Sequence, residues 1–318
     1  MSVDPITVKV TRIHQVAPAI REFTLTPVTT ALSAFSPGSH VVVSMQGTDK
    51  CFKNAYSLLS DPRDSGAYRI AVLLQKQSRG GSRFMHEQVR EGDELTITPP
   101  ANLFAPLWEA RKHVLIAGGV GITPFLSYLP ELQRRHADFE LHHLFKGDYN
   151  GAYCAELAEQ LGERYFDYDS TAGRKCDLAQ LVNGRPLGTH FYVCGPLSLI
   201  EAVQAEALVA GVPDSLIHYE EFSTPQPGAP FEVELKASGR VVPVASEESM
   251  LEALEAAGVA VPNLCRGGVC GQCACAVADG EPEHRDNFLS ASEKRSGKLV
   301  MPCVSRAKGP RLVIDIEE

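Results

Sequence analysis

The sequence lacks the features of a secreted, membrane-spanning or nucleic-acid-binding protein. No basic segment followed by an apolar core stands before the first strand-like run, so we expect no secretory signal and a cytoplasmic location. No apolar run approaches the ~18 residues that a membrane-spanning helix requires. Positive charge is scarce as well, because 30 Lys and Arg stand against 39 Asp and Glu, giving a net charge of −9. This balance opposes a nucleic acid or an anionic membrane as a partner.

The cysteines lack the paired pattern of a secreted domain. Their total of nine is odd, and five are scattered along the chain, which is typical of a protein from a reducing compartment: Cys51, Cys154, Cys176, Cys194 and Cys275. With 318 residues, 44% of them hydrophobic, the chain is long enough for two or three domains with substantial cores. The order of the motifs along the chain fits three.

The other four cysteines form the strongest motif. Cys265, Cys270 and Cys273 are separated by four and then two residues, and Cys303 follows near the C-terminus. This is the plant-type arrangement of ligands for a [2Fe–2S] cluster. A backbone that wraps a small cluster needs positive φ values and N–H groups close to sulfur, which suits the glycines between the ligands: Gly267, Gly268 and Gly271.

Two other interpretations of these cysteines remain. A structural zinc site usually has a second short-spaced cysteine pair, which is absent here, and a disulfide would suit a secreted domain. Cys275 lies two residues after Cys273 in a segment, Ala274–Ala278, that we expect to be a buried strand. Because free cysteine packs as a small hydrophobic residue, we expect Cys275 to fill the core rather than to act as a fifth ligand.

Residues 1–105 are rich in β-branched and aromatic residues and lack helical periodicity. Turn signals separate six expected strands: Ile6–Val10, Ile20–Thr26, His40–Met45, Phe52–Leu58, Tyr68–Leu74 and Glu94–Thr98. They predict an antiparallel β-barrel, interrupted late by one helix over Ser82–Val89. Before this helix, Arg79-Gly80-Gly81-Ser82 forms either an anion-binding turn or an ordinary helix N-cap.

From His113 onward the pattern changes to alternating strands and helices, which predicts a doubly wound parallel α/β sheet. The expected strands are Val114–Ala117, Glu140–Phe145, Tyr165–Tyr168, His190–Cys194 and Ile217–Phe222. The expected helices are Tyr153–Leu161, Asp177–Leu181 and Leu197–Ala210.

The first of these strands leads into a nucleotide-type turn, in which Pro124 replaces the usual third glycine. Gly119 and Gly121 allow the backbone to approach a ligand, and we expect Thr123 to cap the helix that Pro124 begins. Cys194-Gly195-Pro196 ends a later strand, at the edge where such sheets bind ligands.

The segment Ser223–Pro230 has the composition of a linker stiffened by three prolines, and we place the linker at residues 225–230. A third domain over residues 231–318 begins with an expected hairpin, Phe231–Lys236 and Val241–Val244. A helix with a capping box follows over Ser249–Ala257.

In this order the motifs resemble the phthalate dioxygenase reductase family, flavin-dependent reductases that serve Rieske-type oxygenases. The resemblance covers nearly the whole chain. Asn54-Ala55-Tyr56-Ser57-Leu58 is similar to the family's Arg-x-Tyr-Ser flavin motif, and Gly80-Gly81-Ser82 to its flavin-phosphate turn. Gly118–Pro124 and Cys194-Gly195-Pro196 are similar to its pyridine-nucleotide sites, and Phe222 to its aromatic residue near the isoalloxazine.

The resemblance implies a multidomain fold. An antiparallel β-barrel over residues 1–105 would bind flavin, and an α/β doubly wound domain over residues 106–224 would bind NAD(H). After the linker at 225–230, an α+β ferredoxin-like (β-grasp) domain over residues 231–318 would hold the plant-type [2Fe–2S] cluster.

The resemblance also implies roles for single residues. Tyr56 would flank the flavin ring, Ser57 would hydrogen-bond near its reactive nitrogen, and Cys194 would lie by the nicotinamide, with Phe222 near the isoalloxazine. Without the resemblance, ordinary strand packing is the preferred explanation of Tyr56 and Cys194.

The family usually carries FMN, so we expect FMN rather than FAD. Asn54 stands where the family usually has arginine, and Arg79 or Arg83 could supply the missing cationic contact to the flavin phosphate. We expect NADH rather than NADPH. Lys146 could bind a 2′-phosphate, whereas Asp148 would bond the ribose hydroxyls and repel one; the alternative is that both lie in a solvated loop.

The implied function is electron transfer from NADH through the flavin and the cluster to a separate terminal Rieske non-haem iron oxygenase. The sequence offers no convincing local set of two histidines and a carboxylate with which this chain could oxygenate a substrate itself. Arg266, the only charge in the cysteine loop, is expected on the docking surface of a monomer. A stand-alone NADH:flavin or ferredoxin reductase and a redox-sensing regulator are the alternatives.

Overall fold

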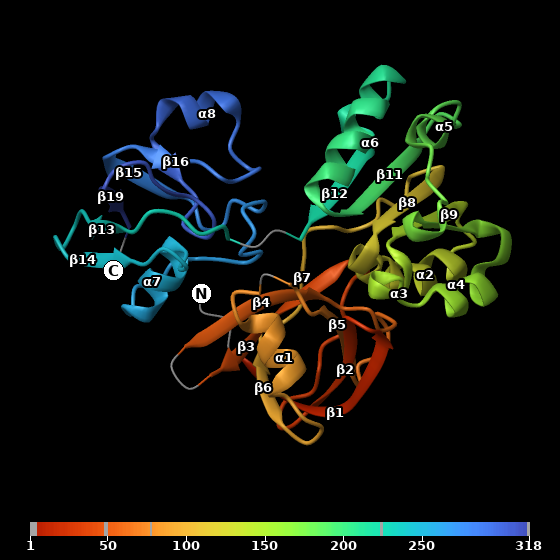
Figure 1. The fold of residues 1–318 in the computed structure, drawn as a ribbon, viewed down its shortest axis with the longest axis horizontal. Coiled ribbons are helices and arrows are strands. Elements are labelled where there is room, and N and C mark those ends of the chain that lie inside the picture. Colours follow the sequence, from red (N-terminus) through yellow and green to blue (C-terminus); the bar gives the residue numbers. More distant parts are fainter. Residues whose placement is uncertain (1–4, 48–49, 77, 223–224, 317–318) are drawn as a thin grey trace. The chain divides into compact units, whose positions relative to one another are not determined.

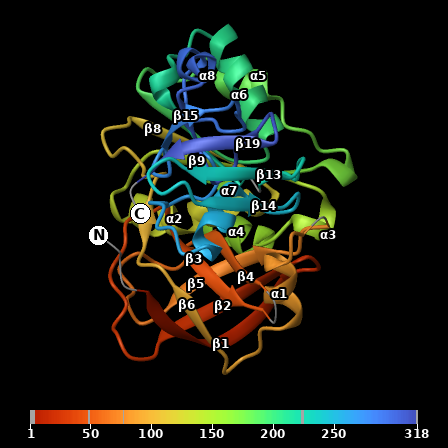
Figure 2. The same cartoon turned by 90° about the vertical axis from the view of Figure 1, so that its left-hand side faces the viewer.

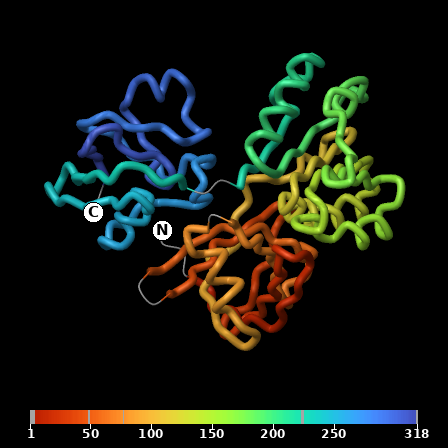
Figure 3. The backbone as a smooth tube through the Cα atoms, viewed as in Figure 1, coloured from red at the N-terminus to blue at the C-terminus, as the bar shows by residue number. Residues whose placement is uncertain are grey.

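The computed structural model describes residues 5–47, 50–76, 78–222 and 225–316. The chain separates into two compact units, Met1–Phe222 and Ser223–Glu318 (Figure 1). The chain path passes from one unit to the other once (Figure 3). No helix in the described part of the chain has both the length and the apolar composition needed to cross a membrane.

The first sheet of the first unit is antiparallel and curls on itself (red to orange in Figure 1). Its strands are β1 (Ile6–Ala17), β2 (Ile20–Pro27), β3 (Ser39–Gln46), β4 (Cys51–Ser57), β5 (Tyr68–Leu73), β6 (Glu94–Ile97) and β7 (Ala101–Asn102). They lie in the order β4-β3-β6-β1-β2-β5, with β7 paired to β3, and the end strands β4 and β5 contact each other. Every second side chain at the start of β1 is buried, as the strand period requires. The predicted antiparallel barrel is confirmed.

The second sheet of this unit is parallel throughout. It contains β8 (Lys112–Gly118), β9 (Phe139–Phe145), β10 (Tyr165–Asp169), β11 (Thr189–Gly195) and β12 (Ile217–Glu221), in the order β10-β9-β8-β11-β12. The helices are α2 (Thr123–Arg134), α3 (Gly147–Asn150), α4 (Cys154–Leu161), α5 (Leu178–Val182) and α6 (Leu197–Val209). One buried cluster joins the sheet to α2 and α4, and another joins it to α5 and α6. Helices therefore cover both faces, and the predicted doubly wound sheet is confirmed.

The barrel and the parallel sheet share an apolar cluster. Ala17, Ile20 and Leu59 from the barrel region pack with Val120 and Tyr153 from the α/β region. Such shared burial removes apolar surface from water and ties the two sheets into one unit. The helix α1 (Gly81–Glu87) packs on β3, β4 and β5 of the barrel.

The second unit contains a mixed sheet with one helix against it. The strands are β13 (Phe231–Leu235), β14 (Val241–Val244), β15 (Cys275–Asp279), β17 (Leu299–Val300) and β19 (Arg311–Asp315), in the order β14-β13-β19-β15-β17, beside the small pair β16 (Pro282–Glu283) and β18 (Arg306–Ala307). Helix α7 (Met250–Ala256) packs beside β14 (Figure 2), and α8 (Ala291–Ser296) follows later. Both helices begin with a capping box, and the one predicted at Ser249 and Glu252 is confirmed.

The described part of the predicted linker is held by the second unit. Arg285 donates to the carbonyl of Gln226 at 2.7 Å, and Arg306 donates to the carbonyl of Ala229 at 3.0 Å. The side chain of Arg306 is buried and also binds the carbonyl of Ala245. The first two residues of the predicted segment, Ser223 and Thr224, lie outside the described residues.

Candidate functional site

The four predicted cysteine ligands lie in the second unit. Cys265, Cys270 and Cys273 occupy the loop after α7, and Cys303 occupies the turn before β18. The sulfur atoms of Cys273 and Cys303 are 3.3 Å apart, and Cys265 and Cys270 form a second hydrogen-bonded thiol pair. Two thiol pairs are the donor set that a two-iron cluster needs. Within the described ranges, no group of three or more His, Cys, Asp or Glu side chains is arranged to hold a metal ion, and this includes the four cysteines.

Backbone N–H groups point at the sulfur atoms of the loop. The hydrogen bond with Cys270 lowers the pKa of Cys265, with further help from the N–H groups of Gly267 and Val269 against the opposing effect of burial. The N–H of Gly267 lies 3.3 Å from the Cys265 sulfur. Such donors favour the thiolate, which is the form that binds iron.

Of the three loop glycines for which positive φ was predicted, two take it, and the prediction is wrong for Gly267, whose neighbour Arg266 has φ 53° instead. Gly268 has φ 77° and Gly271 has φ 76°. A Cβ on Gly271 would lie 2.3 Å from the ring of Phe288, and one on Gly268 would lie 2.6 Å from the side chain of Val304. Any larger residue at either position would displace the loop.

Cys275 belongs to the core of the second unit, as predicted. Its thiol is buried and lies 3.4 Å from the carbonyl of Cys273, and burial raises its pKa to about 12. The prediction that the whole strand is buried is wrong. Beyond Cys275, the side chains of β15 are half-buried or exposed because this strand packs one face on the core.

The prediction that Arg266 lies on an exposed docking surface is also wrong. Arg266 is 9% exposed, and its guanidinium makes two 2.9 Å bonds to the carboxylate of Glu255 on α7. Asn263 accepts a further bond at 3.1 Å. These three oxygen atoms draw the guanidinium inward, and this planar bidentate pairing makes Arg266 a structural residue of the loop.

In the first unit, the two predicted flavin motifs lie side by side. Asn54, Ala55 and Tyr56 lie on β4, and the Asn54 amide donates to the Tyr56 hydroxyl at 3.1 Å. A Cβ on Gly81 would lie 2.6 Å from the Asn54 amide nitrogen. Gly80 has φ 119°, and a Cβ there would lie 2.4 Å from the Phe52 ring.

Ser57 ends β4 with a buried hydroxyl that has no hydrogen-bond partner within the described ranges. A buried polar atom in this state is rare in proteins, and it fits a hydrogen bond to a bound ring nitrogen. The prediction that Ser82 caps the helix is wrong, because its hydroxyl accepts from the N–H of Gln75 at 3.3 Å and lies 2.9 Å from the Ser78 hydroxyl. Gly80, not Ser82, occupies the N-cap of α1, and no side chain caps this helix.

The nucleotide turn and Cys194-Gly195-Pro196 meet at the carboxyl edge of the parallel sheet. A Cβ on Gly121 would lie 2.1 Å from the carbonyl oxygen of Cys194. A Cβ on Gly118 would lie 2.8 Å from the Pro196 ring and 3.3 Å from the Cα of Gly195. This edge lies between β8 and β11, where the strand order reverses, and open α/β sheets bind their ligands at that point.

The predicted capping role of Thr123 is wrong. The chain makes a 3₁₀ turn over Gly119–Ile122, and α2 begins at Thr123 with Ile122 as its N-cap. The Thr123 hydroxyl donates backward to the carbonyl of Val120 at 3.0 Å. Because the 3₁₀ turn runs directly into the helix, no extended N-cap residue separates them.

Cys194 lies on β11, paired with Glu220 on β12. Its thiol is buried, 4.0 Å from the Glu220 carboxylate, and burial holds its pKa well above the ordinary value. Phe222 follows β12 and is 38% exposed. The structure therefore brings Cys194 to the edge that carries the nucleotide turn, with Glu220 as a neighbour that the sequence analysis did not select.

A second neighbour of the turn was missed. His143 on β9 is fully buried, and its Nε2 lies 3.1 Å from the carbonyl oxygen of Gly119. The available signal was the pair His142-His143 inside a strand whose other residues, apart from Glu140, are apolar. At the end of this strand, Lys146 and Asp148 are both exposed.

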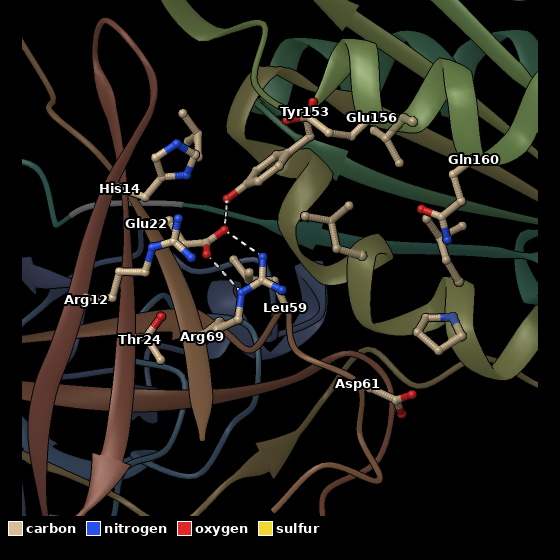
Figure 4. A pocket seen from close by; sticks show the side chains of 15 residues that line it. Arg12, His14, Glu22, Thr24, Leu59, Asp61, Arg69, Tyr153, Glu156 and Gln160 are labelled. Carbon is tan, nitrogen blue, oxygen red and sulfur yellow. Dashed lines mark hydrogen bonds and ion pairs between the residues drawn. The ribbon is translucent and has the colours of Figure 1, made fainter. Parts of the chain in front are cut away.

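A crevice of about 600 Å³ opens between the barrel and the helices α2 and α4 (Figure 4). Its polar wall contains Glu22, which accepts two 2.8 Å bonds from Arg69 and one from the Tyr153 hydroxyl at 2.8 Å. None of the predicted cofactor residues lines this crevice.

Comparison with known proteins gives two family matches within the chain. The family described as "2Fe-2S iron-sulfur cluster binding domain" matches residues 233–308, and "Dimethylamine monooxygenase subunit DmmA-like, N-terminal domain" matches residues 94–217. The heme-dependent oxidative N-demethylase beta subunit of Ectopseudomonas mendocina is 51% identical over 97% of this chain and 98% of that protein. The carnitine monooxygenase reductase subunit of Escherichia coli is 43% identical over 97% of this chain and 98% of that protein.

A solved structure of phthalate dioxygenase reductase covers 98% of this chain and 98% of that chain, with a TM-score of 0.87 and 30% sequence identity. That protein transfers electrons from pyridine nucleotides to a [2Fe-2S] cluster in a modular structure. Its fold accounts for the barrel, the doubly wound sheet and the ferredoxin-like domain described above. The chain therefore belongs to the phthalate dioxygenase reductase family and is an oxidoreductase that combines flavin and nicotinamide-nucleotide binding with a [2Fe–2S] domain.

Proposed function

We propose that this chain takes electrons from NADH through FMN and its [2Fe–2S] cluster and delivers them to a separate terminal oxygenase. The observation that carries the proposal is the presence of both sites in one chain. The nucleotide turn packs against Cys194-Gly195-Pro196 in the first unit, and two thiol pairs lie in the second. Flavin accepts electrons in pairs and releases them one at a time, so it links a hydride donor to a one-electron cluster.

The flavin site is formed by β4 and the start of α1. The unpaired Ser57 hydroxyl would hydrogen-bond near the reactive ring nitrogen, and Tyr56 would flank the ring. Asn54 lies against Gly81, so it reaches the turn that would hold the phosphate although it carries no charge. The family's domain order supports FMN over FAD. Mass spectrometry of the flavin released by heat denaturation tests this choice.

The nucleotide would lie across the edge formed by Gly119, Gly121 and Thr123, with its nicotinamide near Cys194 and Phe222. Asp148, exposed after β9, would bond the ribose hydroxyls and repel a 2′-phosphate, which supports NADH. A kcat/KM for NADPH above that for NADH would overturn this assignment.

The partner is proposed to be an oxygenase with its own active site. A terminal Rieske non-haem iron oxygenase is the first candidate, and the 43% identical carnitine monooxygenase reductase subunit supports an oxygenase partner. A haem-containing oxygenase is the second candidate, because the 51% identical relative is the beta subunit of a heme-dependent N-demethylase. Anaerobic mixing of the NADH-reduced protein with each purified oxygenase separates them, since only the true partner is reduced within its turnover time.

The docking surface is proposed to surround Phe288 rather than Arg266. Phe288 is 50% exposed and its ring packs against Gly271 of the cysteine loop. Exposed aromatic side chains are enriched in protein interfaces. A small, transient interface suits electron transfer between a monomeric reductase and its oxygenase. Analytical sedimentation of the free protein tests whether it is a monomer. We also propose that the protein is cytoplasmic.

Reduction of cytochrome c by NADH tests the electron route. We expect the wild-type protein to turn over and the Cys270→Ser variant to lose this activity while keeping NADH:ferricyanide activity, which draws electrons from the flavin. Full cytochrome c activity in Cys270→Ser would indicate a stand-alone flavin reductase. Negligible turnover by the wild type would indicate a redox-sensing regulator.

A further inference from the structure

A buried hydrogen-bond network lies behind the nucleotide turn. His143 on β9 is completely buried, and its Nε2 lies 3.1 Å from the Gly119 carbonyl oxygen. Its Nδ1 lies 3.1 Å from the Tyr165 hydroxyl and 3.7 Å from the Cys154 sulfur. Side chains from β10 and the start of α4 therefore contact the His143 ring on β9, and it is this ring that contacts the Gly119 peptide of the turn.

The network allows only one tautomer of the His143 ring. Burial lowers the pKa of His143 to about 4, so the ring is neutral near pH 7 and carries a single N–H. A carbonyl oxygen can only accept, so the N–H belongs to Nε2 and points at Gly119. Nδ1 is then the acceptor for the Tyr165 hydroxyl, whose pKa is raised by burial and which stays protonated.

This bond fixes the direction of a peptide plane in the turn. Gly119 has φ 55°, and its carbonyl is directed inward to His143. Because the peptide is planar and trans, the N–H of Val120 points the opposite way. Val120 also packs in the apolar cluster shared with the barrel, which restricts its movement.

We propose that His143 is a positioning residue that holds the Gly119 peptide so that the turn presents backbone N–H groups to the pyrophosphate of the dinucleotide. Backbone N–H groups at such turns are the usual partners of phosphate groups. The proposal rests on the proposed use of this turn for NADH. It assigns no chemical step to His143, which touches neither cofactor nor substrate.

The test compares His143→Leu, His143→Gln and His142→Leu in the full-length holoprotein. Leucine removes the donor, whereas glutamine can place an amide N–H near the position of Nε2. His142 is the matched control because it is 4% exposed on the same strand, and its ring bonds Tyr168 on the other face. The readouts are the Kd of ADP-ribose by calorimetry and the steady-state KM and kcat for NADH with ferricyanide.

We expect His143→Leu to raise both the Kd of ADP-ribose and the KM for NADH about tenfold, with kcat changed less than twofold. His143→Gln should recover most of the affinity, and His142→Leu should leave both constants unchanged. Tyr165→Phe, which removes the donor to Nδ1 but keeps the ring, should weaken binding two- to threefold and serves if His143→Leu does not fold.

Unchanged Kd and KM in the His143 and Tyr165 variants would overturn the proposal. So would equal losses in His143→Leu and His142→Leu, since these would show only a packing defect. A wild-type protein that neither oxidises NADH nor binds ADP-ribose would instead reject the proposed function itself.

Discussion

The cysteine loop and the nucleotide edge prepare their sites in different ways. At the cluster site, three cysteines of the loop and Cys303 would supply the binding atoms, and the backbone of the loop donates N–H groups to sulfur. At the nucleotide edge, the backbone itself would be the binding surface, and Gly121 lies so close to Cys194 that no side chain fits between them. The cluster site depends on the sulfur atoms that its side chains supply. The nucleotide edge depends on glycines, which carry no side chain that would block the approach of a ligand. Substitutions should therefore fail for different reasons in the two places.

The largest effect is expected from removing a thiol. Cys270→Ser should abolish the visible absorption of the iron–sulfur cluster, because the cluster needs all four thiolates. Cys275→Ala is the matched control, since that thiol is buried nearby without belonging to either pair. The cluster spectrum should survive in Cys275→Ala. A cluster spectrum that is retained in Cys270→Ser, or lost in both variants, would contradict the ligand assignment.

At the nucleotide edge, the corresponding experiment adds an atom. Gly121→Ala would place a Cβ 2.1 Å from the Cys194 carbonyl oxygen, which must move because it is backbone. We expect at least about 2 kcal/mol of lost stability or NADH affinity. Gly309→Ala, where nothing lies within 4 Å of the added atom, is the control and should behave as wild type. Normal NADH kinetics in Gly121→Ala would show that the turn tolerates side chains.

A third kind of support is the charged side chain of Arg266, which holds the cysteine loop from inside. Arg266→Met removes a cationic partner of the partly buried Glu255, which keeps a neutral hydrogen bond from Asn263, and we expect a loss of about 3 kcal/mol in the free energy of unfolding. Chemical denaturation measures this loss. The double variant Arg266→Met, Glu255→Leu should recover much of it, because both charges are then removed. If Arg266→Met kept its stability but reduced the oxygenase more slowly, Arg266 would belong to the docking surface after all.

A smaller effect is expected where the barrel meets the α/β region. Tyr153→Phe removes the hydrogen bond to Glu22 but leaves the two bonds from Arg69 in place (Figure 4). Hydrogen bonds to charged groups contribute about 1.5 kcal/mol or more, which sets the expected loss on thermal or chemical unfolding. No change in stability would show that water replaces the tyrosine hydroxyl without cost.

The smallest effect concerns pH. Burial alone would raise the pKa of Glu22, but the bonds and charge of Arg69, with the Tyr153 hydroxyl, lower it below 4.5. A lowered pKa in the folded state stabilises the protein above the unfolded value, and this stabilisation disappears as the pH falls through the folded value. The stability difference between wild type and Glu22→Gln should therefore be constant above about pH 6 and shrink below pH 4.5. A difference that grows on acidification would give the opposite sign and contradict the pairing.

The sequence was sufficient to predict those parts of the structure that local sequence patterns determine. The positive φ values of Gly268 and Gly271 and the alternating strands and helices depend on near neighbours in the chain, and the structure confirms them. The capping box of α7 is another local pattern that was predicted.

The errors arose where a side chain finds a partner that the local pattern does not contain. Arg266 is turned inward by Glu255, eleven residues earlier on α7. Thr123 lost its capping role because a 3₁₀ turn inserts directly before the helix. His143 was missed because its partner, Gly119, lies on another strand's turn, 24 residues away. Tertiary packing decides the cases of Arg266 and His143, whereas the local backbone conformation of the turn decides that of Thr123.

One measurement tests the central claim that a single chain carries electrons from NADH through flavin to the cluster. The purified protein is titrated anaerobically with NADH while its visible spectrum is recorded. We expect the flavin and iron–sulfur absorption both to bleach in the wild-type protein, and only the flavin absorption to bleach in Cys270→Ser. Loss of the flavin band alone in the wild-type protein, with the iron–sulfur absorption unchanged, would contradict the account.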